Sequence, residues 1–145
     1  VKHLTTAERS LLDPALLNWV EVGEQLDLFT YLDATTARAE FGRQMKEFFR
    51  DFDYLVTPTS PLAAHDPVKP PDSKGRGWAD DWMPFTVPFN LSQNPACSVN
   101  CGFTKAGLPV GLQIVGPMHA DQSVLQAAYA FERTRDPVRY PGRAA

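Results

Sequence analysis

The side chains that could act as nucleophiles, general bases or metal ligands stand apart from one another along this chain. The candidates are His3, His65, His119, Cys97, Cys101, Ser10, Ser60, Ser73, Ser92, Ser98 and Ser123. No serine lies in a Gly-x-Ser-x-Gly or Ser-x-x-Lys pattern, and the sequence has no His-Glu-x-x-His motif or phosphate-binding glycine loop. The sequence therefore assigns no catalytic residue, no metal site and no cofactor.

The two cysteines, Cys97 and Cys101, lie four residues apart on one predicted strand. At strand spacing they are about 13 Å apart, which is too far for a disulfide. We expect small, buried, apolar side chains, which fits a reducing compartment. The alternative is a metal site with His119 as third ligand, but strand spacing splays such ligands apart.

An aromatic and proline-rich segment offers a binding site in place of a catalytic one. Its candidate substrate-binding residues are Trp82, Phe85, Thr86, Phe89 and Asn90. Aromatic walls with a few polar groups are typical of small-molecule pockets. Two alternatives stay open: the rings could cover a sheet edge, and Asn90 could cap a helix or turn.

Helices are predicted within residues 5–52, before any strand. Thr5 and Glu8 have the spacing of a capping box, and Asp13-Pro14 is typical of a second helix start. A third helix is indicated by apolar residues at steps of three and four, with charged residues on its other face. These apolar residues are Ala34, Ala37, Phe41, Met45, Phe48 and Phe52.

The remaining elements follow from residue 53 onward. We expect a strand at 53–57 ended by Pro58, a long loop at 58–81, and a pocket segment with a strand pair at 82–116. Five residues join the two strands, and Gly102, Gly107 and Gly111 suit bulges or close backbone approach. The second strand is apolar enough to be covered on both faces by helices. A helix at 120–134, with Asp121 as N-cap, completes a single predicted domain at 1–145.

Composition restricts the kind of partner. The chain has 145 residues, 43% hydrophobic content and a net charge of −3, which suits a packed core but not a nucleic-acid surface. No apolar run is long enough to cross a bilayer, and no signal-peptide pattern is present. A cytoplasmic protein that binds a small molecule is the expectation. Because the chain starts at Val1, it could have an unusual start codon, be processed, or be a fragment.

Residues 90–116 carry a resemblance to a known family. The segments Asn90-Leu91-Ser92, Pro95 to Val99, Cys101-Gly102-Phe103 and Gly107 to Gly116 resemble the C-terminal part of the amidase signature family. This resemblance covers roughly residues 10 to 135. It implies an α/β fold, specifically part of an α/β/α sandwich with a mixed sheet and helices on both faces.

The resemblance also implies hydrolysis or transfer of amide bonds. The family uses a Ser nucleophile, a second Ser in a cis peptide and a Lys base, because a serine hydroxyl needs an adjacent base. Those residues belong to a region that precedes the part matched here and is absent from this chain. We therefore expect a C-terminal amidase portion that is inactive alone and needs the missing N-terminal portion or a complementary chain. The alternative is a non-catalytic binding or structural module, or a partner subunit.

Two positions depart from the family pattern. Asn100 stands where the family usually has Pro, which restores a backbone donor and adds an amide. Met83 stands where glutamine-using amidotransferase subunits usually have an acidic residue, although Asp80 and Asp81 are close. This departure favours a small or apolar amide as substrate. An isolated piece of the fold would expose a sheet edge, so homo-oligomers are also expected.

Overall fold

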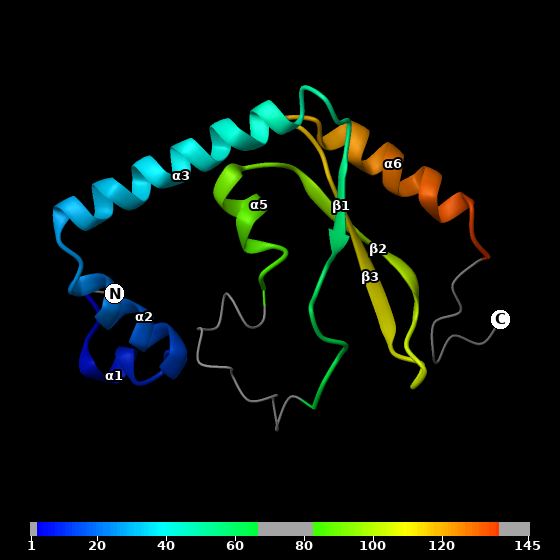
Figure 1. The fold of residues 1–145 in the computed structure, drawn as a ribbon. Helices are drawn as coiled ribbons and strands as arrows, with labels where there is room; N and C mark the ends of the chain where they lie inside the picture. The colour runs from blue at the N-terminus through cyan, green and yellow to red at the C-terminus, as the bar shows by residue number, and fades with distance from the viewer. Residues whose placement is uncertain (1–2, 67–82, 137–145) are drawn as a thin grey trace. The chain divides into compact units, whose positions relative to one another are not determined.

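The structure, a computed structural model, describes residues 3–66 and 83–136 (Figure 1). The chain has two compact units, Val1–Ala37 and Arg38–Ala145. The single domain at 1–145 stays a prediction. The predicted loop at 58–81 lies largely outside the described residues. None of the helices in the described ranges has the length and apolar character required to cross a membrane.

The first unit is helical and begins with the predicted capping box. Helix α1 is Thr6–Arg9, and its N-cap is Thr5. The Thr5 hydroxyl accepts a bond from the Glu8 amide at 3.3 Å, and the Glu8 carboxylate accepts from the Thr5 amide at 2.8 Å. Helix α2 is Pro14–Glu24, with proline at its first position as predicted.

Helix α3, Leu28–Phe48, differs from its predicted bounds and passes from the first unit into the second. It starts before Ala34 because the Asp27 carboxylate accepts a bond from the Thr30 amide at 2.9 Å, which satisfies a free donor of the first turn. It ends before Phe52, where the turn closes with shorter-range bonds such as Arg50 N–H to the Glu47 carbonyl. The Phe52 ring still stacks on Phe48, with centroids 4.7 Å apart.

The second unit contains a three-stranded sheet of order β1-β3-β2. The strands are β1 Leu55–Pro58, β2 Ala96–Phe103 and β3 Pro109–Val115. Both pairings are antiparallel, so the predicted mixed sheet is not found among the described strands. The predicted strand at 53–57 is shifted, and β1 includes Pro58. Proline fits there because β1 has one neighbour among the described strands.

The connection between β2 and β3 is the five-residue hairpin that the sequence predicts. The Thr104 amide donates to the Leu108 carbonyl at 2.8 Å, and Gly107 has a positive φ of 80°. A register shift lies between Asn100 and Gly102, where Gly102 has a φ of 149°. The glycines therefore take the turn and bulge positions expected of them.

Besides the end of α3, the second unit contains the helices α5, Val87–Ser92, and α6, Asp121–Arg133, beside the sheet (Figure 1). Helix α6 packs on β2 and β3. Its N-cap is Ala120 rather than the predicted Asp121, which is the first helical residue. The short helix α5 was not predicted, because prolines surround it. The first turn of α5 contains a proline, which a helix tolerates there. The C-cap of α5 is Gln93, whose backbone has the left-handed conformation.

Candidate functional site

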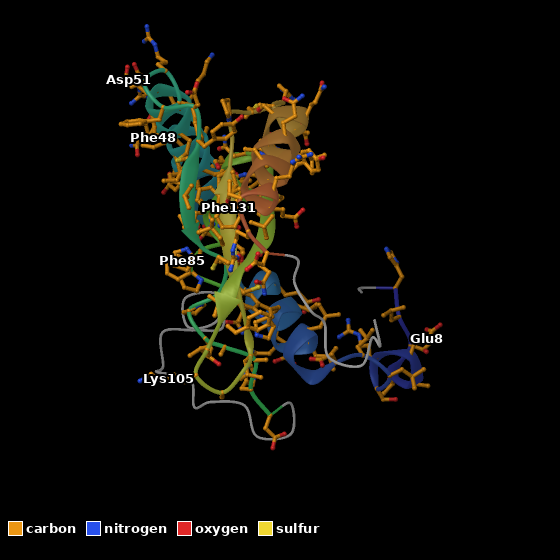
Figure 2. The ribbon with its side chains drawn as sticks, turned by 90° about the vertical axis from the view of Figure 1, so that its right-hand side faces the viewer. Glu8, Phe48, Asp51, Phe85, Lys105 and Phe131 are labelled. Atoms are coloured by element: carbon orange, nitrogen blue, oxygen red, sulfur yellow. The ribbon has the colours of Figure 1, made fainter. Side chains whose placement is uncertain are left out.

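The two faces of the sheet carry different side chains. The face toward α6 is apolar, since Val99 and Ile114 form a buried cluster with Ala128. Cys97, Leu112 and Phe131 pack against the same cluster. Figure 2 labels Phe131 on this side of the sheet and Phe85 on the other side. Because side chains alternate along a strand, the residues between these apolar positions point away from α6.

The face away from α6, here called the polar face, is lined by Thr57, Thr59, Ser98, Asn100 and Gln113. Gln113 pairs with Thr57 on one side and with Ser98 on the other. Its side chain is buried, at 4% exposure. Its Nε2 donates to Thr57 Oγ1 at 2.9 Å and to the Phe85 carbonyl at 2.7 Å. Gln113 therefore ties the segment around Phe85 to the centre of the sheet.

The structure places four of the five predicted site residues in or beside α5, whereas Trp82 lies outside the described residues. Phe89 is buried at 7% exposure, Phe85 and Thr86 are half-buried, and Asn90 is exposed. The Thr86 hydroxyl donates to the Met83 carbonyl at 3.5 Å. Asn90 lies inside α5 and is not the cap that was the alternative for it.

Helix α5 has a second attachment besides Gln113. The Arg38 Nε on α3 donates to the Leu91 carbonyl in the last turn of α5 at 2.9 Å. After the helix, Asn94 Nδ2 donates to the Gly116 carbonyl at the end of β3 at 2.8 Å. The candidate segment is therefore fixed near its start by Gln113 and at its end by Arg38 and Asn94.

A hollow of about 640 Å³ lies at the hairpin end of the polar face, and we call it the hairpin hollow. The Thr59 and Ser98 hydroxyls meet there at 2.6 Å. The described residues that line it are Thr59, Ser60, Pro61, Leu62, Ala63, Ala64, His65, Ser98, Asn100, Thr104, Pro109, Val110 and Gly111. The four described site residues, Phe85, Thr86, Phe89 and Asn90, are not among them. The hollow and residues 83–92, here called the α5 segment, are therefore different parts of the same face.

Gly111 makes the hydroxyl pair possible. Gly111 lies on the central strand β3, between Ser98 on β2 and Thr59, which directly follows β1. The Thr59 amide donates to the Gly111 carbonyl at 3.0 Å. A Cβ at Gly111 would lie 2.7 Å from each hydroxyl oxygen, which is closer than real Cβ atoms approach. The absence of a side chain at Gly111 therefore lets the Thr59 and Ser98 hydroxyls meet.

Burial shifts the acidity of one cysteine. It raises the pKa of the Cys97 thiol, with a smaller contribution from the Glu132 carboxylate. Cys97 and Cys101 are both free thiols. Within residues 3–66 and 83–136, no three acidic, histidine or cysteine side chains gather where they could hold a metal ion. The alternative of a metal site at Cys97, Cys101 and His119 is therefore not supported.

The comparisons with known proteins identify the family. The family model described as Amidase matches residues 7–125. The chain belongs to the amidase family. It is 38% identical over 103 residues to a glutamyl-tRNA(Gln) amidotransferase subunit of Halothermothrix orenii, covering 71% of this chain and 21% of that protein.

Solved structures of amidases agree with the fold. A bacterial aryl acylamidase of the amidase signature family has a TM-score of 0.72 and 27% identity, over 90% of this chain and 28% of that chain. The glutamyl-tRNA(Gln) amidotransferase structure from Thermotoga maritima has a TM-score of 0.63 and 28% identity, over 90% of this chain and 28% of that chain. The α/β class and the partial amidase fold are thus confirmed. This amidase chain spans 21% of the curated relative from H. orenii.

Sequence reasoning missed the polar face of this amidase chain. Gln113 stands in an otherwise apolar run, and a single amide in such a run is the signal that could have indicated a buried hydrogen-bonding role. From the sequence, the apolar residues around Ser98 predict a core hydroxyl with a hydrogen-bond partner. The Ser98 hydroxyl does have a partner, Thr59 at 2.6 Å, but Ser98 is exposed and does not belong to the core. The meeting of Thr59 with Ser98 required the strand register, which the sequence pattern did not supply.

Proposed function

We propose that this chain supplies one wall of an amidase active site that hydrolyses the C–N bond of a small amide. The observation that carries the proposal is the amidase match over residues 7–125, supported by the likeness to an aryl acylamidase. A Ser nucleophile needs an adjacent base. The hydrogen-bond partner of Ser98 is another hydroxyl, so Ser98 is a poor candidate nucleophile, and the catalytic groups are assigned to another part of the enzyme.

The proposed wall is the segment that carries Phe85, Thr86, Phe89 and Asn90, with Trp82 as a further member. Support comes from its attachment to the sheet through Gln113 and to α3 through Arg38. A binding wall must be held in place to be selective. Thr86 and Asn90 are the proposed polar contacts, and the rings of Phe85 and Phe89 the proposed apolar ones.

The proposed substrate is a small or apolar amide rather than glutamine. The basis is Met83, because the amidotransferase subunits that use glutamine usually have an acidic residue at the corresponding position. The thioether of the half-buried Met83 carries no charge that could pair with the ammonium group of a glutamine substrate. An aryl acylamide and glutamine, assayed side by side on the enzyme at its native length, distinguish the two. Preferential release of ammonia from glutamine would overturn this assignment.

The partners of the proposed enzyme are the amide substrate and the remaining amidase portion, whether on the same polypeptide or on a complementary chain. The intact mass of the native protein, detected through a peptide within residues 90–116, distinguishes these arrangements. A species well above 16.1 kDa indicates one longer enzyme. A species of 16.1 kDa indicates a partner chain or a non-catalytic module. A cytoplasmic location remains a prediction from the sequence.

Substitution of Thr86 tests the proposed wall directly. We expect Thr86→Trp to reduce turnover of a small amide by the native enzyme, because the larger ring would occupy space beside the substrate. The melting temperature should change little, since Thr86 is half-buried and forms one weak side-chain bond. Kinetics equal to those of the parent enzyme would remove this segment from the active site. Steady-state kinetics and a thermal melt provide both measurements.

A further inference from the structure

We propose that the hairpin hollow binds a small uncharged ligand through the ligand's carbonyl oxygen. The donors are the Asn100 side-chain amide and the hydroxyl pair of Thr59 and Ser98. The site is separate from the α5 segment, because none of the described residues 83–92 lines the hollow. Because the proposal concerns binding and not bond cleavage, it can fail while the proposed hydrolysis holds, and the reverse is also true.

The hydroxyl pair has a proton to offer. Thr59 and Ser98 together carry two hydroxyl protons, and the bond between them at 2.6 Å uses one. In the part of the chain that the structure describes, the second proton has no acceptor. Both residues line the hollow. A ligand oxygen in the hollow would therefore find a donor already held in place by the other hydroxyl.

Asn100 supplies a second, oriented donor. Its Oδ1 accepts a bond from the Gly102 amide at 3.0 Å, which decides which end of the side-chain amide is the oxygen. Its Nδ2 carries two protons that no residue within 3–66 and 83–136 accepts, and Asn100 lines the hollow. The β-bulge beside Asn100 places the Gly102 amide within reach of the side chain. The bulge therefore fixes the orientation of this donor.

The remaining lining residues indicate the charge and shape of the ligand. Among the described residues that line the hollow there is no Asp, Glu, Lys or Arg, and His65 is the one ionisable side chain. A ligand with a carboxylate would lose hydration of that charge on entering the hollow, and no Lys or Arg among these described residues would compensate for the loss. Apolar contact is available from Leu62, Ala63 and Val110. The described lining residues thus fit an uncharged molecule with a carbonyl oxygen at one end and an apolar body.

Benzamide and benzoate form a matched pair of probes, because they share a ring and a carbonyl and differ in charge. We expect ligand-observed NMR on the native-length protein to detect benzamide binding and to give a Kd for benzoate about tenfold weaker or more. Undetectable benzamide binding at the solubility limit would overturn the proposal. Equal binding of benzoate would overturn the assignment of an uncharged ligand.

Variants locate the binding at the hollow. Asn100→Leu removes both Nδ2 donors at similar volume and should weaken benzamide binding about three- to tenfold. Gln126→Leu, on the exposed side of α6, is the matched control and should leave the Kd unchanged. If Asn100→Leu does not fold, the double variant Thr59→Val with Ser98→Ala carries the same expectation. A Kd unchanged in both the Asn100 variant and the double variant would place the binding elsewhere and overturn the proposal.

Discussion

At the scale of single residues, Gln113 joins the sheet to the candidate segment. Its buried amide makes two bonds, to Thr57 Oγ1 and to the Phe85 carbonyl. These acceptors come from an adjacent strand and from the segment before α5, elements that are far apart in the sequence. Gln113 therefore holds the segment that we propose as a binding wall in place, and its role in the proposal is to position that segment.

We predict that Gln113→Met destabilises the protein by about 1–3 kcal/mol, because it leaves two acceptors without their donor. Urea unfolding measures the loss. Gln126→Met, at an exposed position of α6, should stay within about 0.5 kcal/mol of the parent. Hydrogen exchange should also rise within residues 83–92 in the Gln113 variant. Unchanged exchange there would show that Gln113 does not hold the segment.

Gly111 allows a second prediction at this scale. A Cβ at residue 111 would meet the Ser98 and Thr59 hydroxyls at 2.7 Å, so Gly111→Ala should cost about 1–3 kcal/mol in unfolding free energy. Gly42→Ala is the matched control, because its Cβ meets no atom within 4 Å. Gly42 lies within α3, so alanine should stabilise by about 0.5–1 kcal/mol there. Equal effects at both sites would contradict the close approach over Gly111.

At the scale of elements, α3 carries a chain of charges along its exposed face. Arg43 pairs with Glu40 at 2.8 Å and with Glu47 at 3.3 Å, and Arg50 pairs with Glu47 at 3.2 Å. The hydrogen bond from Arg43 lowers the pKa of Glu40 from 4.5 to about 2, with a smaller contribution from Gln44. Solvent screens such pairs, so they affect the titration of the helix more than its stability.

We predict that Glu40 titrates well below its ordinary value of 4.5. Ionised Glu40 stabilises the folded chain at pH values above 4.5, where Glu40 is ionised in the unfolded chain as well. This stabilisation is lost as the pH falls from 4.5 toward about 2. Carboxyl-carbon NMR measures the titration. Arg43→Gln should return the pKa of Glu40 toward 4.5, and high salt should act in the same direction. A midpoint near 4.5 in the parent protein would show that the pair does not persist in solution.

The elements were predictable where the local pattern was strong. The capping box at Thr5, the proline start of α2, the hairpin and the last helix all follow from residues close in sequence. The start of α3 was missed because its signal was the single cap Asp27, and α5 was missed because prolines hide a short helix. The candidate site was predictable only as a segment. The hydroxyl pair over Gly111 depends on strand register, which local sequence does not determine.

At the scale of the whole molecule, the chain carries part of an amidase fold and leaves apolar surface uncovered. Within the described residues, β1 and β2 each have one neighbouring strand. Val56 on β1 is 54% exposed, and in the first unit Phe29 is 77% exposed. Exposed edges and apolar side chains of this kind favour association with another chain.

We predict that the 145-residue chain, expressed alone, associates with itself in a concentration-dependent manner. Light scattering after size-exclusion chromatography measures the mass. Val56→Lys should reduce the association, because a charge on an edge strand opposes strand pairing. Gln122→Lys adds the same charge at an exposed position of α6 and should have little effect. A monomer across the full concentration range would contradict the prediction.

The alternation of side chains along β3 has a consequence for how this protein can diverge. Leu112 and Ile114 serve the packing against α6, while their neighbours Gly111 and Gln113 serve the polar face. Neighbouring residues of β3 therefore have different roles, one in packing and the other on the polar face. Substitutions at Ser98 and Asn100, the proposed ligand contacts on the polar face, can therefore be made without rebuilding the apolar layer. Recognition in this chain can thus evolve faster than its architecture.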